Sequence, residues 1–328
     1  MEKDGLVLFD LDPAWGQGAR IAEHLEVPLS PHEERSFEDG ELKVRPLVGV
    51  RNKDVYVVQS LQGDAERSVH DKLCRLLFFA GAVKDASAAR VTVVAPYLAY
   101  ARKDRRTKPR DPVTLRYLAS LMEAVGVDRV VTVDVHNQAA FENAFRCRTE
   151  HLEARKLFVA HLAPLIGERA VSIVSPDVGG VKRAERLRES LEHALGRAVG
   201  LAFMEKTRSG GVVRGETLVG DVRDRMVVIV DDLISTGTTM MRAASASRMA
   251  GCGPIHVAAT HGVFVGGAPA VVASPLFDRV VVTDTLPPFR LPERLVAHHV
   301  TVLGTAPLLA EAIVRIHRGG SVSELLAD

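Results

Sequence analysis

The amino-acid sequence predicts an α/β protein with two doubly wound domains, each built on a parallel sheet. Short apolar runs rich in Val and Ile recur along all 328 residues, and helical segments alternate with them. This alternation is typical of βαβ units, and the number of runs suits two sheets better than one. The length also exceeds the usual size of a single domain, which favours two.

Eight runs are predicted to be strands. Because successive positions in them are apolar, we expect them to be buried on both faces of a parallel sheet. The runs are LVLF (6–9), VYVV (55–58), VTVVAP (91–96), RVVTV (129–133), VSIV (171–174), MVVIV (226–230), IHVAAT (255–260) and RVVVT (279–283).

The clearest helix is predicted over residues 111–126, DPVTLRYLASLMEAVG. Asp111 is expected to cap it, Pro112 to begin it and Gly126 to end it. Its apolar residues recur at helical spacing and are expected to face a core: Leu118, Leu121, Met122 and Val125.

We expect an N-terminal α/β domain over residues 1–149 and a C-terminal α/β domain over residues 150–328. The polar stretch TEHLEARK (149–156) is predicted to open a new helix at this boundary. The segment TAPLLAEAIVRIH, from residue 305, is predicted to be an amphipathic helix, with the N-terminal domain as one surface on which it can pack.

The composition excludes several classes of protein. With 42 basic and 41 acidic residues, there is no global charge to attract nucleic acid or an anionic membrane. No apolar run reaches the roughly 18 residues that a membrane helix needs. Cys74, Cys147 and Cys252 form no CxxC spacing, which favours a reducing compartment. We therefore expect a cytoplasmic protein.

Polar residues gather directly after the predicted strands, where ligands bind in doubly wound sheets. In VVIVDDLISTGTTM (227–240), the run Ser235–Thr239 would place backbone N–H groups and hydroxyls at a helix N-terminus, which suits a phosphate. Gly237 would let the backbone approach closely. Asp231 and Asp232 would repel a phosphate, so we expect them to accept hydrogen bonds from sugar hydroxyls.

This stretch therefore predicts a sugar-phosphate site. The alternative is a strand followed by an N-capped helix. Two adjacent acids at the end of a buried strand are costly, which favours a function.

Residues 96–110 concentrate basic side chains at a density that suits a polyphosphate: Arg102, Lys103, Arg105, Arg106, Lys108 and Arg110. A solvated basic loop is the alternative. The position directly after a predicted strand favours a ligand site.

Several of these segments resemble known families. The stretch 227–240 resembles the phosphoribosyl-pyrophosphate motif that type I phosphoribosyltransferases share with ribose-phosphate diphosphokinases, also called phosphoribosyl-pyrophosphate synthetases. PYLAYARKDRR (96–106) resembles the PYxxYARQDRK segment of the diphosphokinases alone. Other segments resemble that family in its order: SFEDGE (36–41), PRDPVT (109–114), VVTVDVH (130–136), SPDVGG (175–180) and EKTR (205–208).

The resemblance implies two α/β domains of the type I phosphoribosyltransferase kind and a transferase of nucleotide biosynthesis. The family transfers the β,γ-diphosphoryl group of ATP to the 1-hydroxyl of ribose 5-phosphate, giving 5-phosphoribosyl 1-pyrophosphate and AMP. The resemblance also implies that Lys206 and Arg208 are catalytic. They would lie on a loop whose Gly210 and Gly211 would let it close over substrates. Residues implied to bind ribose 5-phosphate are Asp177, Asp231, Asp232, Ser235, Thr236, Gly237, Thr238 and Thr239.

The chain has no GxxxxGK[ST] motif, so ATP would be held differently. The resemblance implies ATP-binding roles for Phe37, Asp39, Glu41, Arg102 and Lys103. In the family the loop that corresponds to 36–41 comes from a neighbouring subunit, which implies a homo-oligomer with the active site at a subunit interface. An exposed Phe37 beside acids is also typical of a simple hairpin turn. His136 and Asp177 are the implied contacts to Mg²⁺.

Two other functions are compatible with part of this pattern. A phosphoribosyltransferase would use the same sugar loop but would not need SFEDGE and YARKDRR. A non-catalytic regulatory homologue would not need the residues retained here: Lys206, Arg208, His136 and Asp231.

The chain departs from the family pattern in three places. Lys103 stands where the family usually has Gln, and Thr207 where it usually has Arg. Residues 68–79 also differ from the acidic, Met-containing helix start of the family, so control by ADP and phosphate is not implied.

Overall fold

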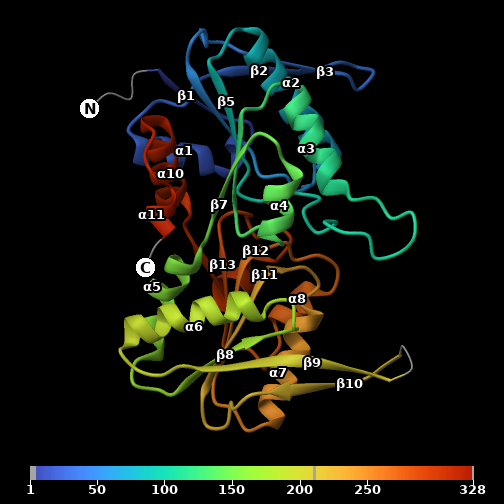
Figure 1. The fold of residues 1–328 in the computed structure, drawn as a ribbon, viewed down its shortest axis with the longest axis vertical. Helices are drawn as coiled ribbons and strands as arrows, with labels where there is room; N and C mark the ends of the chain where they lie inside the picture. The colour runs from blue at the N-terminus through green and yellow to red at the C-terminus, as the bar shows by residue number, and fades with distance from the viewer. Residues whose placement is uncertain (1–4, 210–211, 327–328) are drawn as a thin grey trace. The chain divides into compact units, whose positions relative to one another are not determined.

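The structure, a computed structural model, describes residues 5–209 and 212–326, with the side chains of residues 206–216 outside the description. The chain divides into two compact α/β units (Figure 1). One contains the residues up to Leu152 together with the segment from Thr305, and the other contains Glu153–Gly304. Across the described residues, no helix combines the length and the apolar character needed to span a membrane.

The sheet of the first unit has five parallel strands among the described residues, in the order β1-β4-β5-β6-β7. Their bounds are β1 Leu6–Asp10, β4 Asp54–Val58, β5 Arg90–Val94, β6 Arg129–Val133 and β7 Arg148–Leu152. An antiparallel hairpin of β2 (His32–Ser36) and β3 (Leu42–Pro46) forms a separate small sheet.

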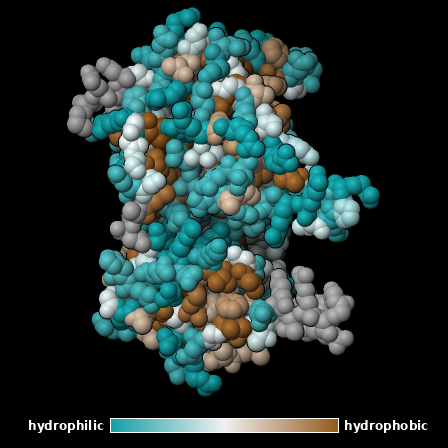
Figure 2. Space-filling view, viewed as in Figure 1, coloured by the Kyte–Doolittle hydropathy of each residue, from teal (hydrophilic) through white to brown (hydrophobic). Residues whose placement is uncertain are grey.

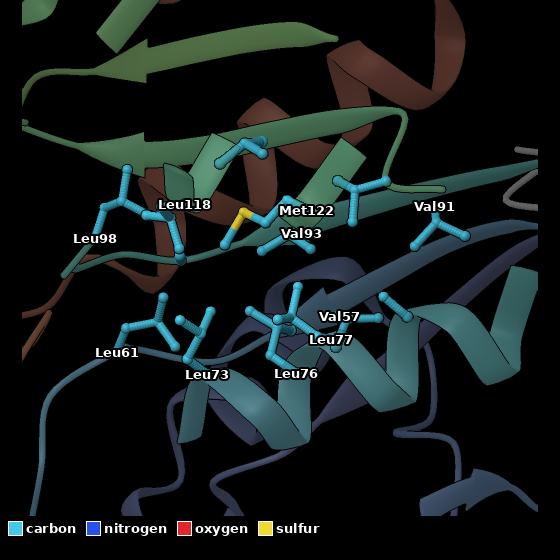
Figure 3. Close-up of a cluster of buried hydrophobic side chains, with 14 of the residues drawn as sticks. Val57, Leu61, Leu73, Leu76, Leu77, Val91, Val93, Leu98, Leu118 and Met122 are labelled. Carbon is cyan, nitrogen blue, oxygen red and sulfur yellow. The ribbon is translucent and has the colours of Figure 1, made fainter. Parts of the chain in front are cut away.

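Helices cover both faces of this sheet. On one face, α2 (Val69–Asp85) and α3 (Thr114–Ala124) share a buried cluster with β4 and β5, shown in Figure 3. On the other face, α1 (Gln17–Leu25) directs its Gly18 amide at the Asp10 carboxylate, over 3.0 Å. The remaining helices are η1 (Pro13–Trp15), α4 (Gln138–Ala144), α10 (Ala306–Arg318) and α11 (Ser323–Leu326).

Helix α10 is held in the first unit by polar contacts. Just before the helix, Thr305 accepts a hydrogen bond from Gln17 over 3.1 Å. Near its end, His317 lies 2.8 Å from Asp54 at the start of β4. The 13 residues of α10 therefore belong to the same unit as the first strands of the chain.

Helix α2 carries two cations into the interior of the first unit. The ammonium of Lys72, which is 0% exposed, contacts Asp12 at 3.1 Å and Asp64 at 2.7 Å. The guanidinium of Arg75, which is 1% exposed, contacts Asp12 at 2.5 Å and Glu34 at 3.2 Å. These ion pairs connect α2 to the loops after β1 and β4 and to the hairpin strand β2.

In the second unit, seven strands are described, in the order β10-β9-β8-β11-β12-β13-β14. Their bounds are β8 Val171–Ser175, β9 Gly200–Ser209, β10 Val212–Val219, β11 Met226–Ile234, β12 Ile255–Gly262, β13 Arg279–Thr283 and β14 Val300–Leu303. Neighbouring strands are parallel except β9 and β10. The chain extends the sheet from β8 to one side with β9 and to the other with β11, so the strand order reverses between β8 and β11.

This sheet is also packed between helices. Helices α7 (Thr238–Met249), α8 (Ala268–Val272) and α9 (Glu293–His299) pack in one hydrophobic cluster with inner residues of β11, β12 and β13. Helices α5 (Arg155–Ile166) and α6 (Val181–Leu195) pack against each other, and α6 packs on β8 and β9. The predicted fold class of two doubly wound α/β sheets is confirmed.

All eight predicted strands are present, but three local predictions were wrong in whole or in part. TEHLEARK opens a helix only at its last two residues: residues 149–152 belong to β7, a polar edge strand, and α5 begins at Arg155. Asp111 does not cap α3, which begins after Val113 without a side-chain cap, because the Asp111 carboxylate bonds to the loop before it. Leu121 is 48% exposed rather than facing the core.

Candidate active site

The point where the strand order of the second sheet reverses is where ligands bind in doubly wound folds. Pairing between β8 and β11 ends at Val174 and Ile229, whereas β11 continues beside β12 as far as Ile234. Asp231 and Asp232 therefore lie within β11, beyond the part that pairs with β8. The sequence predicted that the strand ends at residue 230 and that these acids follow it. That prediction was wrong, because β11 continues beside β12 for four more residues.

The segment after β11 forms a tight turn into α7. Gly237 has a φ of +79°, in the left-handed region, and is the N-cap residue of the helix. Two backbone bonds hold the turn against the segment that follows β12: Phe264 N–H to Ile234 O and Val265 N–H to Ser235 O, both 3.0 Å. The first turn of a helix directs N–H groups outward, so this segment can receive an anionic group.

The side chains of this turn supply hydroxyl groups next to those amides. The hydroxyls of Thr236 and Thr238 lie 3.0 Å apart, and Thr239 follows in the first turn of α7. A Cβ on Gly237 would lie 2.6 Å from Cγ1 of Val271. Both the backbone conformation and the close packing therefore require Gly at this position.

A second turn, after β8, carries Asp177 toward the same strand ends. Oδ1 of Asp177 accepts the Gly180 N–H over 3.0 Å, and the Ser175 hydroxyl donates to the Asp177 carbonyl over 2.6 Å. A Cβ on Gly180 would lie 2.7 Å from the Ser175 hydroxyl oxygen. The SPDVGG segment thus folds as a compact turn that leads directly into α6.

The acidic pair has a cationic neighbour that the sequence did not identify. Nη1 of Arg183, on α6, lies 3.2 Å from Oδ1 of Asp231 and 3.6 Å from Oδ1 of Asp232. Burial, together with the charge of Asp232, raises the pKa of Asp231 well above its ordinary value, and Arg183 opposes that rise. One feature of the sequence could have pointed to Arg183. It is a basic residue in the first turn of a helix, where cations are unfavourable.

Lys206 and Arg208 fall on strand β9, where their backbones pair with Glu216 and Val213 of β10. Their side chains, and Gly210 and Gly211, lie outside the described residues. Their catalytic role stays a prediction.

In the first unit, the basic segment forms a long loop between β5 and α3 that projects as a hydrophilic feature in Figure 2. Arg102 is exposed on this loop. The Lys103 ammonium instead bonds to Asp111 over 2.6 Å and to the Thr107 hydroxyl over 3.2 Å. The Asp111 carboxylate also accepts the backbone N–H groups of Thr107 and Lys108, and the Lys103 bond holds its pKa well below the ordinary value.

His136 is exposed in the segment between β6 and α4. Its neighbour Asn137 caps α4 by accepting the Ala140 N–H over 3.1 Å. The amide of Asn137 donates to Asp104 of the basic loop over 2.7 Å. The structure thus brings the basic loop and the His136 segment together.

Phe37, Asp39 and Glu41 lie on the turn of the β2–β3 hairpin. Phe37 is 41% exposed, and its N–H bonds to the Glu41 carbonyl over 2.8 Å. In Figure 1 the tip of this hairpin is drawn far from the loop between β5 and α3. Within one copy of the chain, the hairpin residues and the basic loop are therefore not brought together.

The carboxylates of the candidate site are oxygen donors of the kind that a hard cation prefers. Among residues 5–209 and 212–326, no group of three or more His, Cys, Asp and Glu side chains could hold a metal ion. The acids of the second unit supply hard oxygen ligands, which Mg²⁺ prefers, and Mg²⁺ is ordinarily held by one or two carboxylates, substrate phosphates and water. This donor set fits a nucleotide-bound Mg²⁺ rather than a metal held by protein alone.

Comparison with known proteins places these features in context. Residues 6–126 match the N-terminal domain of ribose phosphate pyrophosphokinase, and residues 209–327 match the phosphoribosyl synthetase-associated domain. A ribose-phosphate pyrophosphokinase from Caldanaerobacter subterraneus is 38% identical over 94% of this chain and 93% of its own. One from Ralstonia nicotianae is 34% identical over 100% of both chains.

A solved structure agrees with these sequence matches. The crystal structure of phosphoribosylpyrophosphate synthetase from Mycobacterium smegmatis superposes with a TM-score of 0.85. It is 33% identical and covers 97% of this chain and 100% of its own. The similarity therefore extends over both α/β units.

Proposed function

The chain belongs to the ribose-phosphate pyrophosphokinase family, and on that premise we propose that it synthesises 5-phosphoribosyl 1-pyrophosphate from ATP and ribose 5-phosphate. The observation that carries this proposal is the arrangement at the strand reversal of the second sheet. There an acidic pair is followed by a turn of hydroxyls and amides at the start of α7. This combination suits a sugar that carries both hydroxyls and a phosphate.

The second unit would bind the sugar. The 5-phosphate would accept hydrogen bonds from the turn formed by Ser235, Thr236, Gly237, Thr238 and Thr239. Asp231 and Asp232 would accept hydrogen bonds from ribose hydroxyls, with Asp177 beside them. Fixing the sugar at both ends would hold its 1-hydroxyl in one orientation, which favours attack on a bound phosphate.

In the reaction, the 1-hydroxyl oxygen forms a bond to the β-phosphorus of ATP, and its proton is released to solvent. The bond between the β-phosphorus and the oxygen bridging to the α-phosphorus breaks, and AMP leaves. Lys206 and Arg208 would stabilise the charge on the transferred group. Mg²⁺, which His136 and Asp177 would hold, neutralises phosphate charge when it is bound with ATP.

ATP would be held by the exposed loops of the first unit. Arg102 and Lys103 would contact the nucleotide, and Phe37, Asp39 and Glu41 of a second copy would complete its pocket. The separation of hairpin and basic loop within one copy supports a shared site and a homo-oligomer. The Lys103–Asp111 pair would have to open, or Lys103 would act by shaping the loop. We place this activity in the cytoplasm, in nucleotide biosynthesis.

The test is AMP formation from ATP and Mg²⁺, with and without ribose 5-phosphate, for the wild type and for Lys206→Ala. We expect AMP only with the sugar, no ADP, and loss of AMP in the variant with unchanged thermal unfolding. Wild-type protein that is folded and oligomeric but forms no AMP would contradict the proposal and favour a regulatory homologue.

A further inference from the structure

A single arginine contacts both acids of the proposed sugar site. Arg183 projects from α6, and its Nη1 reaches Oδ1 of Asp231 and Oδ1 of Asp232, over 3.2 and 3.6 Å. The three side chains are 26%, 20% and 4% exposed, in that order. Ion pairs at this depth are screened far less than those on an open surface.

The contacts fix one oxygen of Asp231 and place a cation beside one oxygen of Asp232. Oδ1 of Asp231 accepts from Arg183 and also from the backbone N–H of Asp232, over 2.9 Å. Successive residues of a strand point to opposite sides, so a side chain that reaches both acids ties their orientations together. One guanidinium, with several N–H groups in a rigid plane, can serve both acids in this way.

The position of Arg183 is not explained by helix stability. It is the third residue of α6, where the partial positive charge of the helix N-terminus disfavours a cation. Arg186, one turn later on the same helix, pairs with Glu153 at 2.8 Å and is 51% exposed. Violations of a local preference are typical of functional positions, and here the compensating contact is the acidic pair.

We propose that Arg183 is a positioning residue that presents Asp231 and Asp232 to the vicinal hydroxyls of a pentose 5-phosphate, and so determines selectivity for ribose over 2-deoxyribose. The identity of the sugar rests on the proposed function. Arg183 would present the two acids by bonding to Oδ1 of Asp231 and placing its positive charge beside Oδ1 of Asp232. It does not itself contact the transferred group.

Calorimetric titration of ribose 5-phosphate and 2-deoxyribose 5-phosphate tests this assignment, with the wild type, Arg183→Gln, Arg183→Lys and the control Arg186→Gln. In Arg183→Gln we expect ribose 5-phosphate to bind at least about tenfold more weakly. The acidic pair loses its charged partner, and its hydrogen bonds to the sugar hydroxyls weaken. Binding of the deoxy sugar should change much less, so the preference for ribose falls. Arg183→Lys should restore part of the preference, and Arg186→Gln should behave as the wild type.

In steady-state assays, KM for ribose 5-phosphate should rise in Arg183→Gln while KM for ATP stays unchanged. Equal weakening of both sugars, or no weakening, would overturn the assignment even if the wild type forms AMP. Preferential binding of ribose 5-phosphate that Arg183→Gln abolishes, without any AMP formation, would overturn only the proposed reaction. Absence of sugar binding by the wild type would overturn both.

Discussion

Substitution of Gly237 by Ala tests whether the turn before α7 is the phosphate cradle. Two costs follow from the structure. A non-glycine residue with φ near +79° costs about 1–2 kcal/mol. The added Cβ would also lie 2.6 Å from Cγ1 of Val271, so the turn or α8 must shift.

The affinity change follows from the first of these costs. If the turn of the variant relaxes to relieve the strain in the free protein, binding must return it to the strained conformation. The free energy of that strain is then subtracted from the free energy of binding. A change of about 1–2 kcal/mol corresponds to roughly a 5- to 30-fold loss of ribose 5-phosphate affinity. The contact with Val271 adds to this loss and lowers the midpoint of thermal unfolding.

Calorimetric titration with ribose 5-phosphate and thermal unfolding measure the two effects. The double variant Gly237→Ala, Val271→Ala removes the close contact, so it should recover part of the affinity and retain the loss due to φ. Gly49→Ala is the control, because its Cβ would meet nothing within 4 Å and its φ is not positive. Wild-type affinity and stability in Gly237→Ala would refute the role of this turn.

Three further substitutions probe the first unit. Lys72→Ala should lower the free energy of unfolding by about 3–5 kcal/mol, measured by urea titration, because its two carboxylate partners lose a buried cation. Asp54→Asn should destabilise the protein at neutral pH but not at low pH. Burial opposes the charge of Asp54, yet Arg90 and His317 bond to it and hold its pKa below the ordinary 3.8. Its stabilisation is therefore present above about pH 4 and is lost as the pH falls through the lowered pKa. Asp111→Asn should raise KM for ATP in AMP-formation assays and increase amide hydrogen exchange in residues 103–111, because the carboxylate bonds twice to backbone N–H groups and once to an ammonium.

Each of these predictions has an outcome that contradicts it. Lys43→Ala is the control for Lys72→Ala, since Lys43 is 47% exposed and should change stability by less than about 0.5 kcal/mol. Equal effects of the two substitutions would show that the buried cation is not needed. A stability difference between Asp54→Asn and the wild type that does not shrink as the pH falls through the acidic range would contradict the assigned ion pairs. Unchanged hydrogen exchange in Asp111→Asn would show that the loop is ordered by other contacts.

The strands could be predicted because apolar residues at successive positions report burial on both faces, as in RVVTV and MVVIV. Strands without that pattern were not predicted, although the exposed Phe37 beside acids gave a hairpin turn as one alternative. The β2–β3 hairpin and β7 are polar, since they lie outside the sheet interior or at its edge. In TEHLEARK, polarity was taken as the start of a helix, although here it reflects an exposed edge strand.

The candidate site was also predictable in part. The sugar-phosphate segment was recognisable because its chemistry lies in one continuous stretch. Contacts between distant segments were not recognisable: Arg183 reaches Asp231 of β11 from helix α6, and Asp104 contacts Asn137, 33 positions away in the sequence. Asp111 was predicted to cap the helix that follows. Its carboxylate instead accepts hydrogen bonds from four donors in the preceding loop.

The most direct test of the proposed reaction is ³¹P NMR of the products formed from ATP, Mg²⁺ and ribose 5-phosphate. Transfer of the intact β,γ-diphosphoryl group predicts the signals of AMP and of a diphosphate attached to the sugar, in equal amounts. Appearance of ADP with a singly phosphorylated 1-position, or free pyrophosphate without a sugar product, would contradict it.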